Sequence, residues 1–278
     1  MAALRLFAIV VLIAVAASVG FALSLAPGGG ARRIARSAQR AFCLLACKAL
    51  GIIVDAKGRL PTGAPVLLVA NHISWTDILA LGSLTPLAFV ARHDLADWPV
   101  LGLLARSYGA LFVERGRRRQ IPEINRQMAA RLGQSEIVAL FPEATTGDGT
   151  RVRKFHSPHF AAAGALLNMR EEVASVLVAP AAISYTHRRG LPLGRNGRAS
   201  VAWYGDTEFG PHLVDLLQAG RTQCTIRLLE PISFERNTSR KIVTRQAAEA
   251  IRAAFRQEIM AAGPEQATAY VLSSRQVV

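Results

Sequence analysis

The sequence of 278 residues is long enough for one large domain or two small ones, and 51% of it is hydrophobic while only 19% is charged. Its formal net charge of +14 indicates an anionic partner. The apolar excess favours an anionic membrane surface over nucleic acid, so we expect no nucleic-acid partner. The three cysteines, Cys43, Cys47 and Cys224, lack the spacing of zinc ligands or of a disulfide framework, which predicts no metal site and a reducing, cytoplasmic environment.

The N-terminal part of the chain contains an uncharged apolar run from Leu6 to Leu25. About 20 such residues span a bilayer, so we predict a transmembrane anchor over residues 1–30. A cleaved signal peptide is the alternative, but its apolar core is typically shorter than this run. Only Arg5 precedes the run, whereas four arginines follow it, namely Arg32, Arg33, Arg36 and Arg40. The positive-inside rule therefore places the following domain on the cytoplasmic face of the inner membrane, with the protein single-pass or monotopic.

A second apolar segment, from Ala41 to Val54, is too short to span a membrane. Together with the arginines before it, this segment predicts a basic interfacial helix within residues 31–60 that lies on anionic headgroups. The alternative is an ordinary amphipathic helix of the protein core.

From Pro65 onward, short apolar runs alternate with stretches of helical periodicity. We predict strands at 66–70, 87–91, 110–114, 136–141, 176–185, 201–204 and 225–229. We predict helices at 78–84, 98–106, 121–132, 159–169 and 240–261, and a solvated or membrane-facing loop at 187–198. Continuous apolar strands separated by helices predict a mixed α/β domain over residues 61–265, with a largely parallel sheet flanked by helices, and then a tail at 266–278.

The segment NHISWTD, residues 71–77, follows the predicted strand at 66–70, at the strand end where α/β sheets bind ligands. Asp77 can fold back across the turn onto one imidazole nitrogen of His72 and leave the other nitrogen free as a base. The alternative is that Asp77 only caps the next helix beside an unrelated histidine. The chain has no G-x-S-x-G nucleophile elbow and no G-K-[ST] phosphate loop, so we expect the substrate to supply the nucleophile, as an alcohol deprotonated by His72.

Further segments carry candidate binding residues. In GALFVERGRRR, residues 109–119, a predicted strand ends at Glu114 and Arg115, and the arginines suit phosphate oxygens, although a charged surface loop is the simpler interpretation. In FPEATTGDG, residues 141–149, Thr145, Thr146 and nearby backbone N–H groups are suited to hold a phosphate or an oxyanion, with a surface loop again the alternative. In VAPAAISY, residues 178–185, Pro180 predicts a bend in a buried strand.

In this order and spacing, the four segments resemble the motifs of the glycerolipid acyltransferase family, the 1-acylglycerol-3-phosphate acyltransferases, over residues 65–190. The motif N-H-x-S-x-x-D is matched by Asn71, His72, Ser74 and Asp77. The motif F-P-E-G-T is matched by Phe141, Pro142, Glu143 and Thr145. A strand that ends in a polar residue and Arg, and a Pro in an apolar strand, complete the resemblance at 114–115 and 180.

The resemblance implies a mixed α/β fold with a tunnel or groove for an acyl chain. It implies that His72 is the general base and that Asp77 orients it. It places Arg115, beside Glu114, against a phosphate of the acceptor, and it gives Glu143 the role of positioning the acceptor or the loop. It also implies acyl-CoA or acyl carrier protein as the donor substrate, with no cofactor.

Two positions depart from the family pattern. Ala144 replaces the usual Gly, which implies a stiffer or shifted loop, and Thr146 stands where many members have Arg. The missing cation weakens the case for a phosphate-bearing acceptor, and the form with two threonines resembles the subset that includes lyso-ornithine lipid acyltransferases. Because Arg115, Arg117 and Arg151 can compensate, 1-acylglycerol 3-phosphate is the favoured acceptor and lyso-ornithine lipid the alternative.

The sequence therefore predicts a membrane-bound O-acyltransferase of phospholipid biosynthesis that moves a fatty acyl chain onto a lysolipid hydroxyl. A second class is a membrane-tethered protein that binds anionic lipid without chemistry, but such a protein needs neither His72 nor Asp77. A third class is a hydrolase, and the chain lacks the nucleophile of that class.

Overall fold

Nine strands form one mixed sheet in the computed structural model, which describes residues 2–24, 29–97, 102, 105–106, 109–114 and 118–263. The sheet contains β1 (Ile52–Lys57), β2 (Val66–Ala70), β3 (Ala88–Arg92), β4 (Leu111–Val113), β5 (Val138–Leu140), β6 (Val176–Arg188), β7 (Leu191–Pro192), β8 (Thr222–Leu228) and β9 (Ile232–Phe234). The α-helices are α1 (Ala2–Ser24), α2 (Gly29–Leu50), α3 (Thr76–Leu84), α5 (Ile121–Leu132), α6 (Ala161–Met169), α7 (Arg195–Ala199), α8 (Phe209–Ala219) and α9 (Arg240–Ala261). Short 3-10 helices are η1 (His93–Asp97), η2 (Arg118–Gln120) and η3 (Pro158–Phe160).

The strand order is β1-β8-β6-β2-β5-β3-β4, and β7 and β9 both pair with β6. The run β6-β2-β5-β3-β4 is parallel throughout, β1 and β8 are also parallel, and β6 is antiparallel to β7, β8 and β9. All five residues of β2 are buried, as expected for a central strand covered on both faces. The predicted largely parallel α/β sheet is confirmed.

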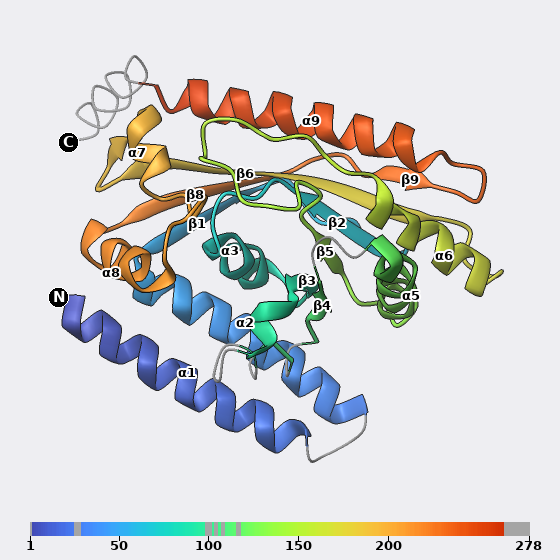
Figure 1. The fold of residues 1–278 in the computed structure, drawn as a ribbon, viewed down its shortest axis with the longest axis horizontal. Helices are drawn as coiled ribbons and strands as arrows, with labels where there is room; N and C mark the ends of the chain where they lie inside the picture. Colours follow the sequence, from blue (N-terminus) through green and yellow to red (C-terminus); the bar gives the residue numbers. More distant parts are fainter. Residues whose placement is uncertain are drawn as a thin grey trace, which may run out of the picture.

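Helices cover both faces of the sheet, and Figure 1 shows α9 along one face with α3, α2 and α1 stacked on the other. On its inner side, α9 buries Val243, Ala247, Ile251 and Phe255. Burial of the larger of these side chains, Val243, Ile251 and Phe255, stabilises the fold by roughly 1.5–3 kcal/mol each. The two helix layers therefore give the molecule two outer surfaces that point in opposite directions.

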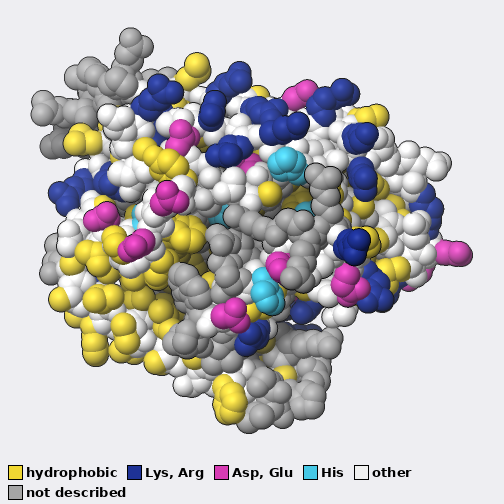
Figure 2. Space-filling view, viewed as in Figure 1, with side chains coloured by type: hydrophobic (Ala, Val, Ile, Leu, Met, Phe, Trp, Pro, Cys, Tyr) yellow, Lys and Arg dark blue, Asp and Glu magenta, His cyan; other side chains and the backbone are white. Residues whose placement is uncertain are grey.

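The outermost helix, α1, packs along α2 and buries Ile9 and Ala16. Its other side exposes large apolar residues, and Figure 2 shows hydrophobic side chains gathered at the lower left, over α1 and α8. The exposed apolar residues of α1, α2 and α8, which we call the apolar face, are Leu4, Leu6, Phe7, Val10, Val11, Val15, Val19, Phe21, Ile34, Leu44, Leu45 and Val214. Among the described helices, one, at Ala2–Ala22, is long and apolar enough to cross a membrane.

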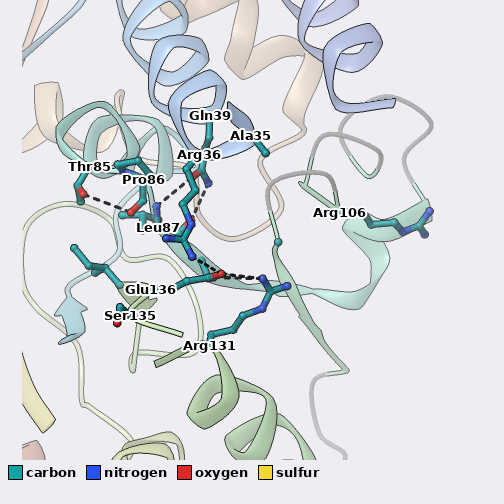
Figure 3. Close-up of a pocket in the computed structure, with 13 residues that line it drawn as sticks. Ala35, Arg36, Gln39, Thr85, Pro86, Leu87, Arg106, Arg131, Ser135 and Glu136 are labelled. Carbon is teal, nitrogen blue, oxygen red and sulfur yellow. Dashed lines mark hydrogen bonds and ion pairs between the residues drawn. The ribbon is translucent and has the colours of Figure 1, made fainter. Parts of the chain in front are cut away.

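Two polar side chains of α2, Gln39 and Arg36, bind groups of the sheet domain. Gln39 is buried, donating to the carbonyl of Leu87 at 2.8 Å and accepting from its N–H at 3.1 Å. Arg36 pairs with Glu136 at 2.7 Å, and Arg131 reaches the same carboxylate at 3.3 Å. Figure 3 shows these groups converging beside a cavity of about 310 Å³. Arg36 therefore has a partner within the domain, and the placement of the arginines before residue 41 on headgroups stays a prediction.

The helix predicted at 41–54 ends at Leu50, and residues 52–54 instead begin β1. Gly51 terminates the helix with φ of +75°, and a Cβ there would lie 2.9 Å from the carbonyl oxygen of Gly220. The β-branched residues Ile52, Ile53 and Val54 then favour a strand, which pairs with β8. The predicted interfacial segment at 31–60 is thus part helix and part sheet.

Other differences from prediction lie in the second half of the chain. The strand predicted at 201–204 is absent, because Val201 and Trp203 bond elsewhere: the carbonyl of Val201 accepts from His212 at 3.1 Å, and the N–H of Trp203 donates to Ile73 at 3.0 Å. The predicted loop at 187–198 contains the end of β6, then β7 and α7. The strand β9 and the helix α8 were not predicted. Most of the helix predicted at 98–106, and the tail at 266–278, lie outside the described residues.

Candidate active site

Two of the predicted motif loops leave the same edge of the sheet, because β2 and β5 are parallel neighbours with Val69 opposite Leu140. The loop at 71–77 follows β2 and the loop at 141–149 follows β5. They are joined by the N–H of Gly147, which donates to the carbonyl of His72 at 2.8 Å. The first and third motifs therefore form one site at the carboxyl ends of the central strands.

His72 is held in this site through both its side chain and its main chain. Its Nδ1 lies 2.8 Å from Oδ2 of Asp77, and its backbone N–H donates to Oε1 of Glu143 at 3.1 Å. The imidazole stacks on Phe141 with ring centroids 4.1 Å apart, and the side chain of His72 is 15% exposed. Because Nδ1 faces a carboxylate, Nδ1 carries the proton and Nε2 has a lone pair that can accept a substrate proton.

Asp77 is completely buried, and four groups donate to its carboxylate. Besides His72, the backbone N–H groups of Ile73 and Ser74 donate to Oδ2 at 2.6 and 2.9 Å. The hydroxyl of Tyr185 donates to Oδ1 at 2.8 Å. Asp77 is thus not merely a helix cap beside an unrelated histidine, because its carboxylate closes the turn and binds the imidazole at once.

Tyr185 was not identified as a site residue from the sequence. It lies fully buried in β6, and its hydroxyl accepts from Thr76 at 2.6 Å while donating to Asp77. Burial disfavours its ionised form, so the pKa of Tyr185 is raised above the usual value and it stays a donor. A signal existed, because a tyrosine in a buried, largely apolar strand needs a partner for its hydroxyl.

Asn71 fastens the same loop to β6. Its side-chain amide donates to the carbonyl of Ile183 at 2.9 Å, and its Oδ1 accepts from the N–H of Ile183 at 2.8 Å. Pro180 lies earlier in β6, between the residues that pair with β9 and those that pair with β8. Val178 is the last residue of β6 to pair with β9, and Ala181 is the first to pair with β8. A residue without an N–H fits this junction.

Glu143 is 3% exposed, and both of its oxygens bind main-chain groups. Oε1 accepts from the N–H of His72 and Oε2 from the N–H of Arg153, each at 3.1 Å. Burial, with a contribution from Asp77, raises the pKa of Glu143 from 4.5 to about 7. Of the two roles that the family resemblance gives Glu143, this geometry favours positioning the loop over contacting the acceptor.

Thr145 and Thr146 lie half-buried between Glu143 and Gly147. The N–H of Gly147, one of the groups expected to bind a phosphate or an oxyanion, is already bonded to the carbonyl of His72. Ala144 adopts the left-handed conformation, with φ of +58°. The usual Gly of the family pattern would suit this conformation, so the loop keeps its shape with a residue that is strained there.

We expect Ala144→Gly to raise the stability of the protein by up to about 1 kcal/mol, because relief of roughly 1–2 kcal/mol of strain exceeds the entropic cost of the glycine. The thermal midpoint of the full chain in detergent should rise, with acyl transfer unchanged within about twofold. Ala144→Val, which adds a β-branched side chain at the same φ, should lower the midpoint. A lower midpoint for Ala144→Gly would contradict the strain.

The second motif contributes less to the described site. Glu114 follows β4 and its Oε2 accepts from Gln120 at 3.4 Å. Arg115 and Arg117, the predicted phosphate contacts, lie outside the described residues. Within the described part of the chain, no group of three or more His, Cys, Asp or Glu side chains is arranged to hold a metal ion.

Comparisons with known proteins identify relatives of this chain. A family model described as "Acyltransferase" matches residues 51–184. A "Lyso-ornithine lipid O-acyltransferase" of Rhizobium meliloti is 40% identical, in a match that covers 75% of this chain and 71% of the relative. A second protein of that name, from Brucella abortus, is 35% identical, and the match covers 90% of this chain and 95% of the relative. A "1-acyl-sn-glycerol-3-phosphate acyltransferase" of Neisseria gonorrhoeae is 39% identical, in a match that covers 35% of this chain and 38% of the relative.

A solved structure has the same fold. The crystal structure of the 1-acyl-sn-glycerophosphate acyltransferase PlsC from Thermotoga maritima covers 92% of this chain and 97% of its own, with a TM-score of 0.63 and 18% identity. The identity and coverage of the sequence relatives establish the relationship independently of the fold. The chain therefore belongs to the acyltransferase family that includes lyso-ornithine lipid and 1-acylglycerol-3-phosphate acyltransferases.

Proposed function

We propose that this acyltransferase uses His72 as a general base to esterify the free hydroxyl of a lyso-ornithine lipid with a fatty acyl chain from a thioester. The observation that carries the mechanism is the 2.8 Å contact between Nδ1 of His72 and Oδ2 of Asp77, which leaves Nε2 free. Asp77 fixes the tautomer and stabilises the imidazolium that forms.

In the proposed reaction, Nε2 of His72 takes the proton of the acceptor hydroxyl while the oxygen attacks the thioester carbonyl carbon. The tetrahedral intermediate collapses, the carbon–sulfur bond breaks, and the thiolate leaves with the proton that His72 returns. The hydroxyl, the thioester and His72 account for every bond made and broken, so the proposal needs no cofactor.

The choice of acceptor rests on the relatives and on Thr146. At similar identity, the match to lyso-ornithine lipid acyltransferases extends over 75% and 90% of the chain, against 35% for the 1-acylglycerol-3-phosphate acyltransferase. An N-acylated ornithine carries a carboxylate and an amine but no phosphate, which suits a loop with Thr146 where many members have Arg. This support puts lyso-ornithine lipid ahead of 1-acylglycerol 3-phosphate, the acceptor that the sequence alone favours.

The second acceptor is kept because exposed cations, Arg151 and Arg153, follow the third motif closely. Competition between the two lysolipids in one reaction separates the cases. Wild type should prefer lyso-ornithine lipid, and Thr146→Arg should shift the ratio towards the phosphate by about tenfold or more, the effect of roughly 1.5–3 kcal/mol from charge-assisted hydrogen bonding. Thr146→Ser should leave the ratio unchanged. A wild type that acylates only 1-acylglycerol 3-phosphate would reject the proposed acceptor and leave acyl transfer intact.

We also propose that the apolar face attaches the protein to the cytoplasmic face of the inner membrane, in contact with anionic lipids. The Arg5 guanidinium donates to the carbonyl of Leu217 in α8 at 3.2 Å, and α1 packs along α2. These contacts hold α1 along the domain, which supports a helix lying in one leaflet over a helix that crosses the bilayer.

The anchor has a direct test. The full chain should resist carbonate extraction, and a chain lacking residues 2–28 should be released, because it loses most of the apolar face while keeping α2 and β1. Retention of acyl transfer in detergent would show that the shorter chain folds. Release of the full chain by carbonate, or a mature chain that begins near residue 25, would contradict the anchor.

A further inference from the structure

Basic side chains line one side of α9. Lys241, Arg245, Arg252 and Arg256 follow one another at helical spacing, beside the residues that pack on the sheet, with Arg252 half-buried and the other three exposed. We call these four residues the α9 basic face, and Figure 2 shows Lys and Arg side chains along the upper rim, over α9. Glu249 is the only exposed acidic residue of the helix. At 1.5 Å per residue, the face is about 22 Å long.

This surface is connected to the candidate active site. Arg252 donates to the carbonyl of Arg153 at 3.3 Å. The N–H of Arg153 donates to Glu143, whose other oxygen accepts from the N–H of His72. Arg151, Arg153 and Lys154 are all exposed, so positive charge continues from the α9 basic face towards the edge of the sheet that carries His72.

The same surface faces away from the membrane side of the molecule. The apolar face belongs to the layer of α1 and α2, and α9 lies on the opposite side of the sheet (Figure 1). A bilayer that takes the apolar face therefore cannot reach α9. The high net charge by itself indicates an anionic membrane, but in this part of the molecule the charge points away from the apolar face.

We propose that the α9 basic face, extended by Arg151, Arg153 and Lys154, docks an acidic protein that delivers the acyl chain to His72 as a thioester. The proposal rests on the proposed function and names the donor partner. The acceptor is a lipid, which reaches the enzyme from the membrane side, so the donor is the substrate that arrives from water. A basic face of this length matches a protein surface better than a nucleotide, and charge complementarity would speed the encounter.

The test compares two donors on the full-length enzyme in detergent, acyl carrier protein and CoA loaded with the same acyl chain. Arg245→Glu together with Arg256→Glu reverses charge on α9 and touches no residue of the catalytic site. Arg245→Lys together with Arg256→Lys is the matched control, because it keeps the charge. Measurements at low ionic strength keep screening weak, since the Debye length falls to about 10 Å at 0.1 M salt.

We expect the Glu pair to raise the KM for acyl carrier protein by about tenfold or more, with kcat at saturation and the KM for acyl-CoA within about twofold of wild type. The Lys pair should match wild type with both donors. An unchanged KM for acyl carrier protein in the Glu pair, or an equal loss with both donors, would overturn the docking surface. So would a wild type that transfers from acyl-CoA alone, although acyl transfer itself would stand. Failure of the proposed function would look different, as no transfer to either lysolipid from either donor.

Discussion

His72→Ala is expected to lower the rate of acyl transfer by ~10²–10⁴-fold, the range for loss of a general base. The imidazole is the group whose Nε2 is free to take the acceptor proton, because Nδ1 is bound to Asp77. Initial rates with saturating lysolipid and thioester measure the effect. The size of the loss should be the same for either thioester donor, since both donate to the same deprotonated hydroxyl.

The substitution should leave the fold intact, which makes it a clean test. The two hydrogen bonds that join His72 to the neighbouring loop, with Glu143 and Gly147, use its main chain and persist in the alanine variant, which loses only the stacking on Phe141 from that loop. The thermal midpoint and membrane attachment should therefore stay close to wild type. Near-full activity of His72→Ala would show that the base lies elsewhere.

Asp77→Asn should also be inactive, but it tests less cleanly. The amide nitrogen of Asn cannot accept a hydrogen bond, so it would face either the donors at Oδ2 or the hydroxyl of Tyr185. The substitution would therefore break hydrogen bonds that hold the loop as well as the one that holds the imidazole. Tyr185→Phe removes a single donor from Oδ1 and keeps the imidazole contact. If Tyr185→Phe lowers the rate of acyl transfer less than His72→Ala does, Tyr185 positions the site while His72 transfers the proton.

The central part of the fold could be predicted because it depends on local pattern. The strand β2 is a continuous apolar run, and α5 and α9 have the 3.6-residue periodicity that fixed their ends at the predicted residues. The edge strand β1 could not be predicted, because Ile52, Ile53 and Val54 continue the apolar pattern of the preceding helix. Only Gly51, whose positive φ is a property of the folded chain, separates the two.

The candidate site was predicted in part for the same reason. His72 and Asp77 lie within one turn, so local sequence is enough to bring them together. Tyr185 and Asn71 act across long distances in the chain, through β6. A local pattern can indicate that a buried tyrosine needs a partner, but it does not identify Asp77 as that partner. The direction of the positive charge also depends on the fold, because sequence counts the cations of α9 and α2 without showing that these helices lie on opposite sides of the sheet.

Glu143→Gln should lower kcat by roughly 10²-fold, the cost of about 1 Å of misplacement at a catalytic group. Only one atom of the Gln amide accepts, so either the N–H of His72 or that of Arg153 loses its partner. A residue that positions His72 lowers kcat and leaves the acceptor KM unchanged, whereas a residue that binds the acceptor raises KM. A raised acceptor KM with normal kcat would therefore reverse the role assigned to Glu143.

The pH dependence of stability gives Glu143 a second signature. Burial raises its pKa from 4.5 to about 7, so the folded protein holds this proton more tightly than the unfolded chain does. The free energy of unfolding should therefore fall as pH rises from about 4.5 to about 7, and this contribution should be constant above that range. Glu143→Gln cannot ionise and lacks this slope, so its stability relative to wild type should improve steadily across the same window. Denaturant unfolding of the two proteins at matched pH values measures the difference. Parallel stability curves for the two proteins would show that Glu143 is already ionised throughout the window, as its two N–H donors alone would favour.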